Sequence, residues 1–494
     1  MSELSYGFAR RHRLLLTQVA EDYCELLHSS QTNAAALQEV RRHLNAPLKL
    51  QLIDDDQLES RINMAYQQQA EASFDAIDDI SNEVDLAQLV EDIPDSQELL
   101  DSDDDAPVIR LINALFSEAL KLGASDVHIE TYETRMAVRL RVDGLLKEIL
   151  QPSRKLAPLL VSRIKVMARL DIAEKRVPQD GRIALRLAGR AVDVRVSTIP
   201  SNYGERVVMR LLDKQAARLD LADLGMPDSV RHDFERLLKH PNGIILVTGP
   251  TGSGKTTTLY AGLTLLNDRS RNILTVEDPV EYDIEGIGQT QVNPKVGMSF
   301  AKGLRAILRQ DPDVVMVGEI RDAETADIAV QASLTGHLVL STLHTNNAVG
   351  AITRLIDIGI EPYLIASSLK GVLGQRLVRR LCKHCKQPAE LDAVEADLLG
   401  ESAISGRTVY LPKGCEHCQN TGFKGRIGLY ELLVVDRRIS LLIHDRAGEQ
   451  AIEEAAEGRM STLLAEGRRA VLAGQTSIDE VLRCVREDAV DAGL

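Results

Sequence analysis

The chain of 494 residues is long enough for about three domains, each with a core of its own. Hydrophobic residues make up 44% of it and charged residues 27%, which excludes a chain that is disordered throughout. The formal charge is −15, but residues 73–105 hold thirteen Asp or Glu and no Lys or Arg, so the rest carries −2. Aromatic residues amount to 3% with no Trp, which disfavours a single-strand nucleic-acid binder with a basic, aromatic groove.

The first 72 residues predict a small, mainly helical domain, because apolar residues from Leu14 to Leu26 recur at spacings of three and four. The early apolar run is interrupted by Glu21 and Asp22, so we expect no export signal. Residues 73–107 are acidic and poor in bulky apolar side chains. Because like charges repel, this segment is predicted to be an extended linker that lets the first domain move independently.

An α+β domain is predicted for residues 108–213. A helical pattern is followed by four segments in which apolar and polar residues alternate, as in half-buried strands. These segments are 126–130, 136–142, 182–187 and 192–197. The pair Asp143-Gly144 after the second segment is a strong signal for a hairpin turn.

Residues 214–381 predict an α/β core with a parallel sheet that is covered by helices on both faces. Short, fully apolar runs alternate there with helical segments, which is typical of parallel strands. The runs are 244–247, 273–276, 314–317 and 338–340. The longest charge-free stretch, 328–353, contains polar residues throughout and is therefore not predicted to span a membrane.

The most specific motif in the chain is a P-loop between the first of these runs and a helical segment. Its glycines allow backbone N–H groups to surround phosphate oxygens, its lysine adds a positive charge, and the hydroxyl of Thr256 suits Mg²⁺. The predicted nucleotide-binding residues are Gly249, Pro250, Thr251, Gly252, Ser253, Gly254, Lys255, Thr256 and Thr257.

Two carboxylates follow predicted strands at the edge where ligands bind in open α/β sheets. Glu319 follows the run 314–317 and Glu277 follows 273–276, so either could position water for hydrolysis or simply cap the next helix. His337 and His344 stand at the two ends of a third strand. A lone histidine is usually structural, and either one could instead contact phosphate.

Two C-x-x-C pairs, separated by 29 residues, predict a structural zinc site, because four thiolates complete a tetrahedral shell. The pairs are Cys382 with Cys385 and Cys415 with Cys418. His384 or His417 could replace a thiolate, although four cysteines are the simpler set. Disulfides or unliganded thiols are the alternatives, and a reducing compartment disfavours the disulfides.

Taken together, four sequence boxes resemble those of the bacterial ATPases of type II secretion and type IV pilus assembly. The Walker A, Asp, Walker B and His boxes correspond to residues 249–256, 275–282, 308–322 and 336–346. The resemblance implies a RecA-like P-loop ATPase core that takes ATP and Mg²⁺, and it implies that the preceding α+β domain is PAS-like. It further implies that Glu319 is the catalytic glutamate, that Glu277 is the Asp-box carboxylate, and that His337 and His344 lie near the γ-phosphate.

The same resemblance implies roles for five arginines. Arg195 and Arg210 match family arginines that reach from the preceding domain toward the nucleotide, where they would stabilise charge on the transferred phosphoryl group. The three others match arginines that line the site or the subunit interface. They are Arg305, Arg309 and Arg321. The resemblance also implies a zinc-binding module over 382–433 and a helical segment over 434–494.

Family membership implies a cytoplasmic homo-hexamer that drives pseudopilus assembly at the inner membrane. We expect residues 1–72 to dock on the cytoplasmic domain of an L-type assembly protein, with an F-type platform protein as a further partner and no nucleic acid. Membrane association would then be indirect. Three alternatives stay open: a type IV pilus assembly ATPase, a RecA-like nucleic-acid translocase, and a scaffold that binds nucleotide without hydrolysing it.

Overall fold

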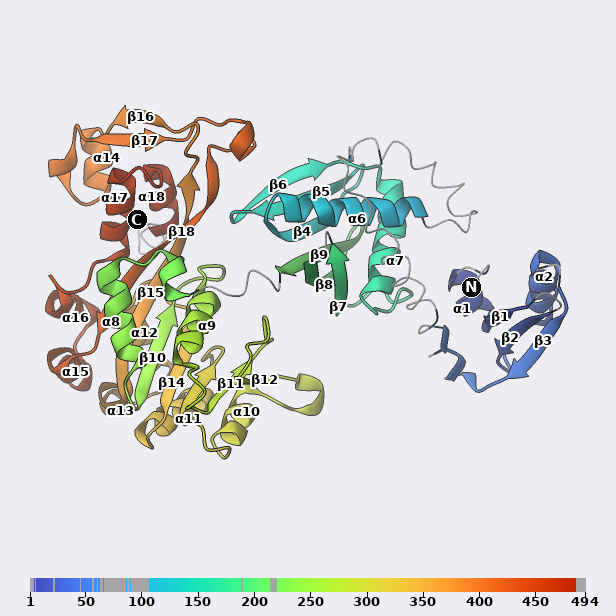
Figure 1. Cartoon of the computed structure of the whole chain (residues 1–494), viewed down its shortest axis with the longest axis horizontal. Coiled ribbons are helices and arrows are strands. Elements are labelled where there is room, and N and C mark those ends of the chain that lie inside the picture. Colours follow the sequence, from blue (N-terminus) through green and yellow to red (C-terminus); the bar gives the residue numbers. More distant parts are fainter. Residues whose placement is uncertain are drawn as a thin grey trace. The chain divides into compact units, whose positions relative to one another are not determined.

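Figure 1 shows the computed structural model of the chain, which divides into two compact units, Met1–Gln215 and Ala216–Leu494. The structure describes residues 4–65 with gaps at 5, 21–22, 45, 56, 60 and 63–64, then 86, 89, 106–187, 190–213 and 220–485. The predicted linker lies almost wholly outside the described residues. Within the described part of the chain, no helix is long and apolar enough to cross a membrane.

The N-terminal residues form a mixed α/β module, so the prediction of a mainly helical segment is wrong. Its elements are α1 Tyr6–His12, β1 Leu14–Val19, β2 Cys24–His28, α2 Ala34–Leu44 and β3 Leu48–Leu52. Leu14 and Leu16 pack with one cluster, whereas Leu15 packs with another, which is the two-residue alternation of a strand. The helix-like spacing combines Leu14 and Val19 of β1 with Leu26 of β2, which belong to two separate strands.

The rest of the first unit is a six-stranded antiparallel sheet with helices on one face. The sheet order is β6-β5-β4-β9-β8-β7. The elements are α6 Ala106–Lys121, β4 Ala124–Thr131, β5 Met136–Val142, β6 Leu145–Leu150, η1 Arg154–Leu156, α7 Ala157–Met167, β7 Gln179–Leu187, β8 Arg190–Ser201 and β9 Gly204–Asp213. All four predicted strand segments lie inside β4, β5, β7 and β8. Val127 and Ile129 of β4 face the helices, so Asp126, His128 and Glu130 lie on the opposite, charged face.

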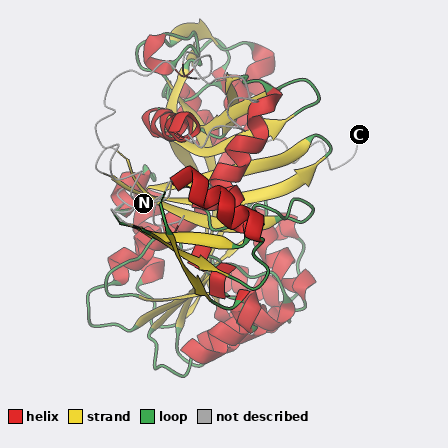
Figure 2. Ribbon diagram, turned by 90° about the vertical axis from the view of Figure 1, so that its right-hand side faces the viewer, coloured by secondary structure: helices red, strands yellow, loops and turns green. Residues whose placement is uncertain are grey.

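The second unit is built on a seven-stranded sheet in the order β12-β11-β13-β14-β10-β15-β18, and all neighbours are parallel except β15 and β18. Its strands are β10 Gly243–Thr248, β11 Ile273–Glu277, β12 Gly288–Gln291, β13 Val314–Val317, β14 Leu338–Leu343, β15 Leu369–Leu381 and β18 Phe423–Val434. Ile244 and Leu246 pack into one apolar cluster, and Ile245 and Val247 into another. The sheet is therefore buried on both faces, as predicted, and Figure 2 shows the helices lying against the strands.

The helices of this unit cover the sheet and then continue into the C-terminal region. They are η2 Leu221–Leu224, α8 Asp228–Leu238, α9 Lys255–Leu266, η3 Pro294–Val296, α10 Phe300–Ile307, α11 Ala323–Leu334, α12 Gly350–Ile358, α13 Pro362–Ser368, α14 Ala393–Leu398, η4 Ser402–Ile404, η5 Glu416–Cys418, α15 Arg437–His444, α16 Glu449–Ala456, α17 Leu463–Leu472 and α18 Ile478–Val485. A small two-stranded antiparallel sheet, β16 Gln387–Glu390 with β17 Thr408–Leu411, lies between the two cysteine pairs. The zinc module was predicted to extend to residue 433, but β18 within it belongs to the core sheet.

Candidate functional site

The predicted P-loop connects the end of β10 to the start of α9. Gly249, Gly252 and Gly254 all have positive φ, at 149°, 81° and 88°. A Cβ on Gly249 would lie 2.4 Å from the backbone oxygen of Gln375, so only glycine fits beside β15 there. Helix α9 starts at Lys255 with no side chain capping it, which leaves the N–H groups of its first turn available to an anion.

Lys255 lies buried under the loop, with 8% of its surface exposed. Its Nζ donates to the carbonyl oxygens of Gly249, at 2.7 Å, and Pro250, at 3.0 Å. Burial lowers the pKa of Lys255 to about 8, and the charge of Glu319 opposes that shift. The buried hydroxyl of Ser253 has no hydrogen-bond partner among the described residues, while Thr256 is exposed at the helix start. This donor-rich cradle fits phosphate.

Glu319 and His344 meet at the carboxyl edge of the sheet. Glu319 comes two residues after β13, and its Oε2 lies 3.5 Å from Nε2 of His344, which directly follows β14. The other carboxylate oxygen lies 2.5 Å from Nη2 of Arg321. Burial and the positive charge of Lys255 lower the pKa of His344, so its imidazole is neutral at pH 7. Sequence reasoning had singled out all four of these residues.

Glu277 lies in the interior, with 3% of its surface exposed. Its carboxylate accepts hydrogen bonds from the hydroxyls of Tyr260 and Thr275 and from Nε2 of Gln289, the last at 3.2 Å. Burial raises the pKa of Glu277 despite these three donors. Its side chain is therefore hydrogen-bonded to its buried neighbours. Its backbone lies beside Gly318, the residue before Glu319.

His337 is not at the P-loop of its own chain, which corrects the prediction that both His-box histidines lie near the γ-phosphate. It precedes β14, whereas His344 follows that strand of six residues. Seven residue steps of about 3.3 Å each therefore place the two histidines roughly 23 Å apart. Because β14 runs parallel to β10, His337 stands at the sheet edge opposite the P-loop. There its Nδ1 lies 2.8 Å from the carbonyl oxygen of Ala332.

The remaining predicted arginines lie in two regions. Arg305 forms an exposed ion pair with Glu324 at 2.6 Å, and Arg309 donates to the carbonyl oxygen of Arg305 at 2.9 Å. Arg195 and Arg210 are opposite each other on β8 and β9 of the first unit. Arg210 is 56% exposed and donates from Nε to Asp126 at 2.9 Å.

Sequence reasoning missed the contribution of β15 to this site. Gln375 accepts a hydrogen bond from Thr258 of α9 at 2.7 Å, and its backbone and amide lie against Gly249 and Gly254. The signal was Gly374, since a glycine inside a strand often marks a close backbone approach. A Cβ at Gly374 would lie 3.3 Å from the backbone nitrogen of Ala348.

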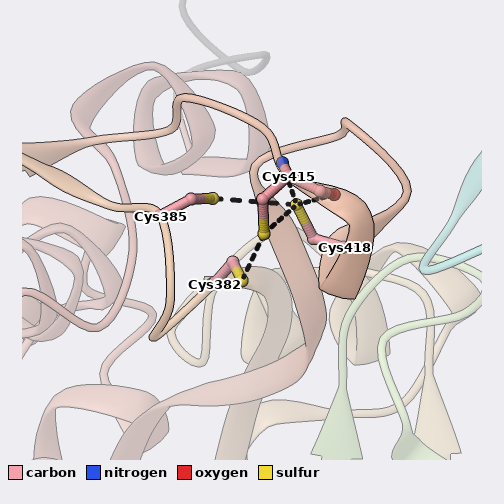
Figure 3. A group of neighbouring side chains, drawn as sticks. All are labelled: Cys382, Cys385, Cys415 and Cys418. Carbon is pink, nitrogen blue, oxygen red and sulfur yellow. Dashed lines mark hydrogen bonds between the residues drawn. The ribbon is translucent and has the colours of Figure 1, made fainter.

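The four predicted cysteines converge on one point (Figure 3). Their Sγ atoms all lie within 4.8 Å of one another, and three of the separations are 3.8, 3.7 and 3.7 Å. Tetrahedral zinc with Zn–S bonds of about 2.3 Å requires Sγ separations of about 3.8 Å, so the cluster fits the metal. The rings of His384 and His417 instead stack on each other, with centroids 4.2 Å apart.

A phosphate-binding loop with a carboxylate at the same edge of a doubly covered parallel sheet defines the class of P-loop ATPases. Residues 101–483 match the family model for type II/IV secretion system proteins, and residues 3–66 match a domain model of GSPII protein E. The chain belongs to the type II secretion system protein E family.

Relatives in this family align over almost the whole chain. Type II secretion system protein E of Pectobacterium carotovorum is 57% identical over 486 residues, covering 98% of this chain and 97% of the relative. Type II secretion system ATPase E of Vibrio cholerae is 56% identical over 487 residues, with 98% and 97% coverage. Among solved structures, the ADP-bound pilus retraction motor PilT is 28% identical with a TM-score of 0.53, covering 75% of this chain and 96% of PilT.

Proposed function

We propose that the protein hydrolyses ATP in a Mg²⁺-dependent reaction and that this reaction powers type II secretion. The observation that carries the proposal is the convergence of Glu319, His344 and Lys255 on the P-loop, in a chain related over its whole length to type II secretion ATPases. Lys255 and the free N–H groups of α9 would bind the outer phosphates of ATP. Thr256 would hold Mg²⁺, which supplies positive charge against the phosphates when bound.

Glu319 is the residue best placed to handle the proton of the attacking water. As the water oxygen bonds to the γ-phosphorus, the bond to the ADP oxygen breaks and the water proton passes to the carboxylate. Arg321 forms an ion pair with that carboxylate, and neutral His344 offers a ring nitrogen for orienting water or phosphate. Glu277, buried among three donors, would act as a positioning residue rather than as a base.

We propose the assembly state, the location and the partners of the protein from its family membership. We infer a cytoplasmic homo-hexamer in which Arg195 and Arg210 reach nucleotide, with Arg305 and Arg309 at the site rim or subunit interface. Residues 1–72 would dock on an L-type assembly protein, and an F-type platform protein would receive the motion. The four-cysteine cluster would hold a structural zinc ion, since all four positions of a tetrahedral shell are filled by thiolates.

The test is ATPase activity of the full chain with and without Mg²⁺, as a function of protein concentration. Addition of the cytoplasmic domain of an L-type protein should raise the activity, whereas single-stranded DNA should leave it unchanged. Stimulation by DNA alone would contradict the proposal and favour a nucleic-acid translocase. Binding of ATP without turnover under every condition would favour a nucleotide-gated scaffold.

A further inference from the structure

The loop His344–Ala348 connects the candidate catalytic centre to the rest of the second unit. Its first residue faces Glu319 at 3.5 Å. Its second, Thr345, is tied to the last residue of β10, because the Thr345 N–H donates to Oγ1 of Thr248 at 3.0 Å and the two hydroxyls lie 2.6 Å apart. Thr248 directly precedes the P-loop, so these hydrogen bonds connect the start of the P-loop to the loop His344–Ala348.

Arg376 joins this loop to helix α18. It lies on β15 with 5% of its surface exposed. Its Nη2 donates to Oδ1 of Asn346 at 3.3 Å, and its Nε donates to the carbonyl oxygen of Cys484 at 3.2 Å. A buried guanidinium is costly unless its donors are paired, so these bonds fix the distance between the loop and α18.

Glu431 joins the same loop to helix α17. It is 4% exposed, and its two carboxylate oxygens accept from the backbone N–H groups of Ala348, at 2.8 Å, and Leu463, at 3.0 Å. Leu463 is the first residue of α17. Glu431 stands opposite Gly374 in the β15–β18 pairing, and the missing side chain at Gly374 leaves room for the contact with Ala348.

We propose that Arg376 and Glu431 are positioning residues which couple the loop His344–Ala348 to helices α17 and α18. Nucleotide binding at the P-loop then changes the packing of these helices, and the helices in turn hold His344 in place for hydrolysis. The proposal rests on the proposed ATPase function and deepens it, because it assigns an output element to the nucleotide site. One buried bridge to a single helix is equally consistent with a structural role, whereas two buried polar side chains that join the same loop to successive helices form a coupled unit.

The test is hydrogen exchange of the full-length protein, with and without a slowly hydrolysed ATP analogue and Mg²⁺. In the wild type, peptides covering residues 463–485 should change their exchange rate about twofold or more when nucleotide binds. Glu431→Gln replaces one acceptor with an NH₂ group that faces a backbone N–H. Arg376→Lys keeps the charge but cannot make both bonds. Both variants should bind the analogue as the wild type does and lose this response.

Steady-state kinetics provide the second readout. Each variant should lower kcat on the order of tenfold, the loss expected for a buried hydrogen bond to a charged group, with KM unchanged. Glu466→Gln is the matched control, because Glu466 is a buried carboxylate of α17 that pairs with Arg469. It should keep both the exchange response and kcat.

A wild-type protein without a nucleotide response in 463–485, or variants that respond as the wild type does, would overturn the coupling. If residues 463–485 of Glu431→Gln already exchange faster than in the wild type without nucleotide, that substitution has destabilised α17 itself. The response of Arg376→Lys then decides whether the coupling exists. If the wild type binds nucleotide but does not hydrolyse it, the ATPase proposal fails. The exchange response can still be measured in that case, because it requires only binding.

Discussion

Lys255 is poised to lose its charge near neutral pH in the nucleotide-free protein, because burial lowers its pKa to about 8. Bound phosphate is negative and must raise the pKa of Lys255. At a pH between the pKa of the free protein and that of the complex, ATP binding therefore takes up a proton. We expect ATP affinity to be full below pH 8 and to weaken as pH rises through that value. Calorimetric titrations at pH 8, in buffers with different ionisation enthalpies, should detect the uptake.

His344 provides the control for this pH dependence. Its pKa lies below the ordinary histidine value, so it does not titrate near pH 8. The variant His344→Gln should therefore still lose ATP affinity as pH rises through 8. Lys255→Arg stays charged, so its ATP affinity should not change over this range. An affinity that is flat from pH 7 to 9 in the wild type would show that Lys255 remains charged in the free site.

A substitution of Glu319 should affect turnover without affecting nucleotide binding. Glu319→Gln keeps the size of the side chain and removes its basicity, so we expect a rate loss of about a hundredfold or more, the usual range for a positioned base. ATP affinity should change little, because the phosphates are bound by the P-loop. Single-turnover hydrolysis and equilibrium binding measure the two effects. A variant with wild-type turnover would remove Glu319 from the mechanism.

Among the elements, those that the sequence predicts well are the ones whose local pattern matches their environment. Strands β10 and β13 are unbroken apolar runs because both faces of the sheet are covered. The P-loop and the cysteine pairs follow from ligand chemistry alone. By contrast, β15 alternates glycines and arginines with apolar residues, and its role at Gly249 and Asn346 depends on tertiary contacts that no local pattern encodes.

The errors at the N-terminal module and at His337 have distinct physical causes. In the N-terminal module, Leu14, Leu15 and Leu16 are all buried because the sheet packs on both faces, so the run lacks the alternation of a half-buried strand. His337 was grouped with His344 by family resemblance, although a parallel strand separates its two ends. A strand-length calculation would have placed the two histidines at opposite edges.

The cysteine cluster lies at the C-terminal end of β15, since Cys382 directly follows that strand. Cys382→Ser combined with Cys385→Ser should reduce zinc from about one ion per chain to none, because two thiolates cannot complete the shell. The two-stranded sheet β16–β17 lies between the two pairs and should then become sensitive to protease. Elemental analysis and limited proteolysis provide the readouts.

Cys484→Ser is the matched substitution for this experiment, because Cys484 lies outside the cluster. It should keep the metal and the resistance to protease. Retained zinc in the double variant would show that the ion is bound elsewhere. Loss of zinc without new cleavage would show that the module folds independently of its metal.

At the scale of the whole molecule, the predicted arginine finger and the P-loop belong to different compact units. Arg210 is a suitable probe because its removal should cost little stability. It is more than half exposed, and its partner Asp126 keeps a second cation, Arg141, at 3.5 Å. Arg210→Ala should therefore fold normally and lose ATPase activity, while Arg206→Ala, on the same strand and paired with Glu130, should keep it.

Mixing variants tests whether Arg210 acts on the nucleotide of a neighbouring subunit. Arg210→Ala chains retain an intact P-loop, and Lys255→Ala chains retain the arginine, so each homo-oligomer should be inactive. In a ring with one arginine donor per site, random mixing of equal amounts would place the two intact parts together at about a quarter of the sites. Activity near that fraction of the wild type should therefore appear after subunit exchange. Exchange without recovery would show that the arginine serves its own chain, because only then do both variants lack a complete site in every arrangement.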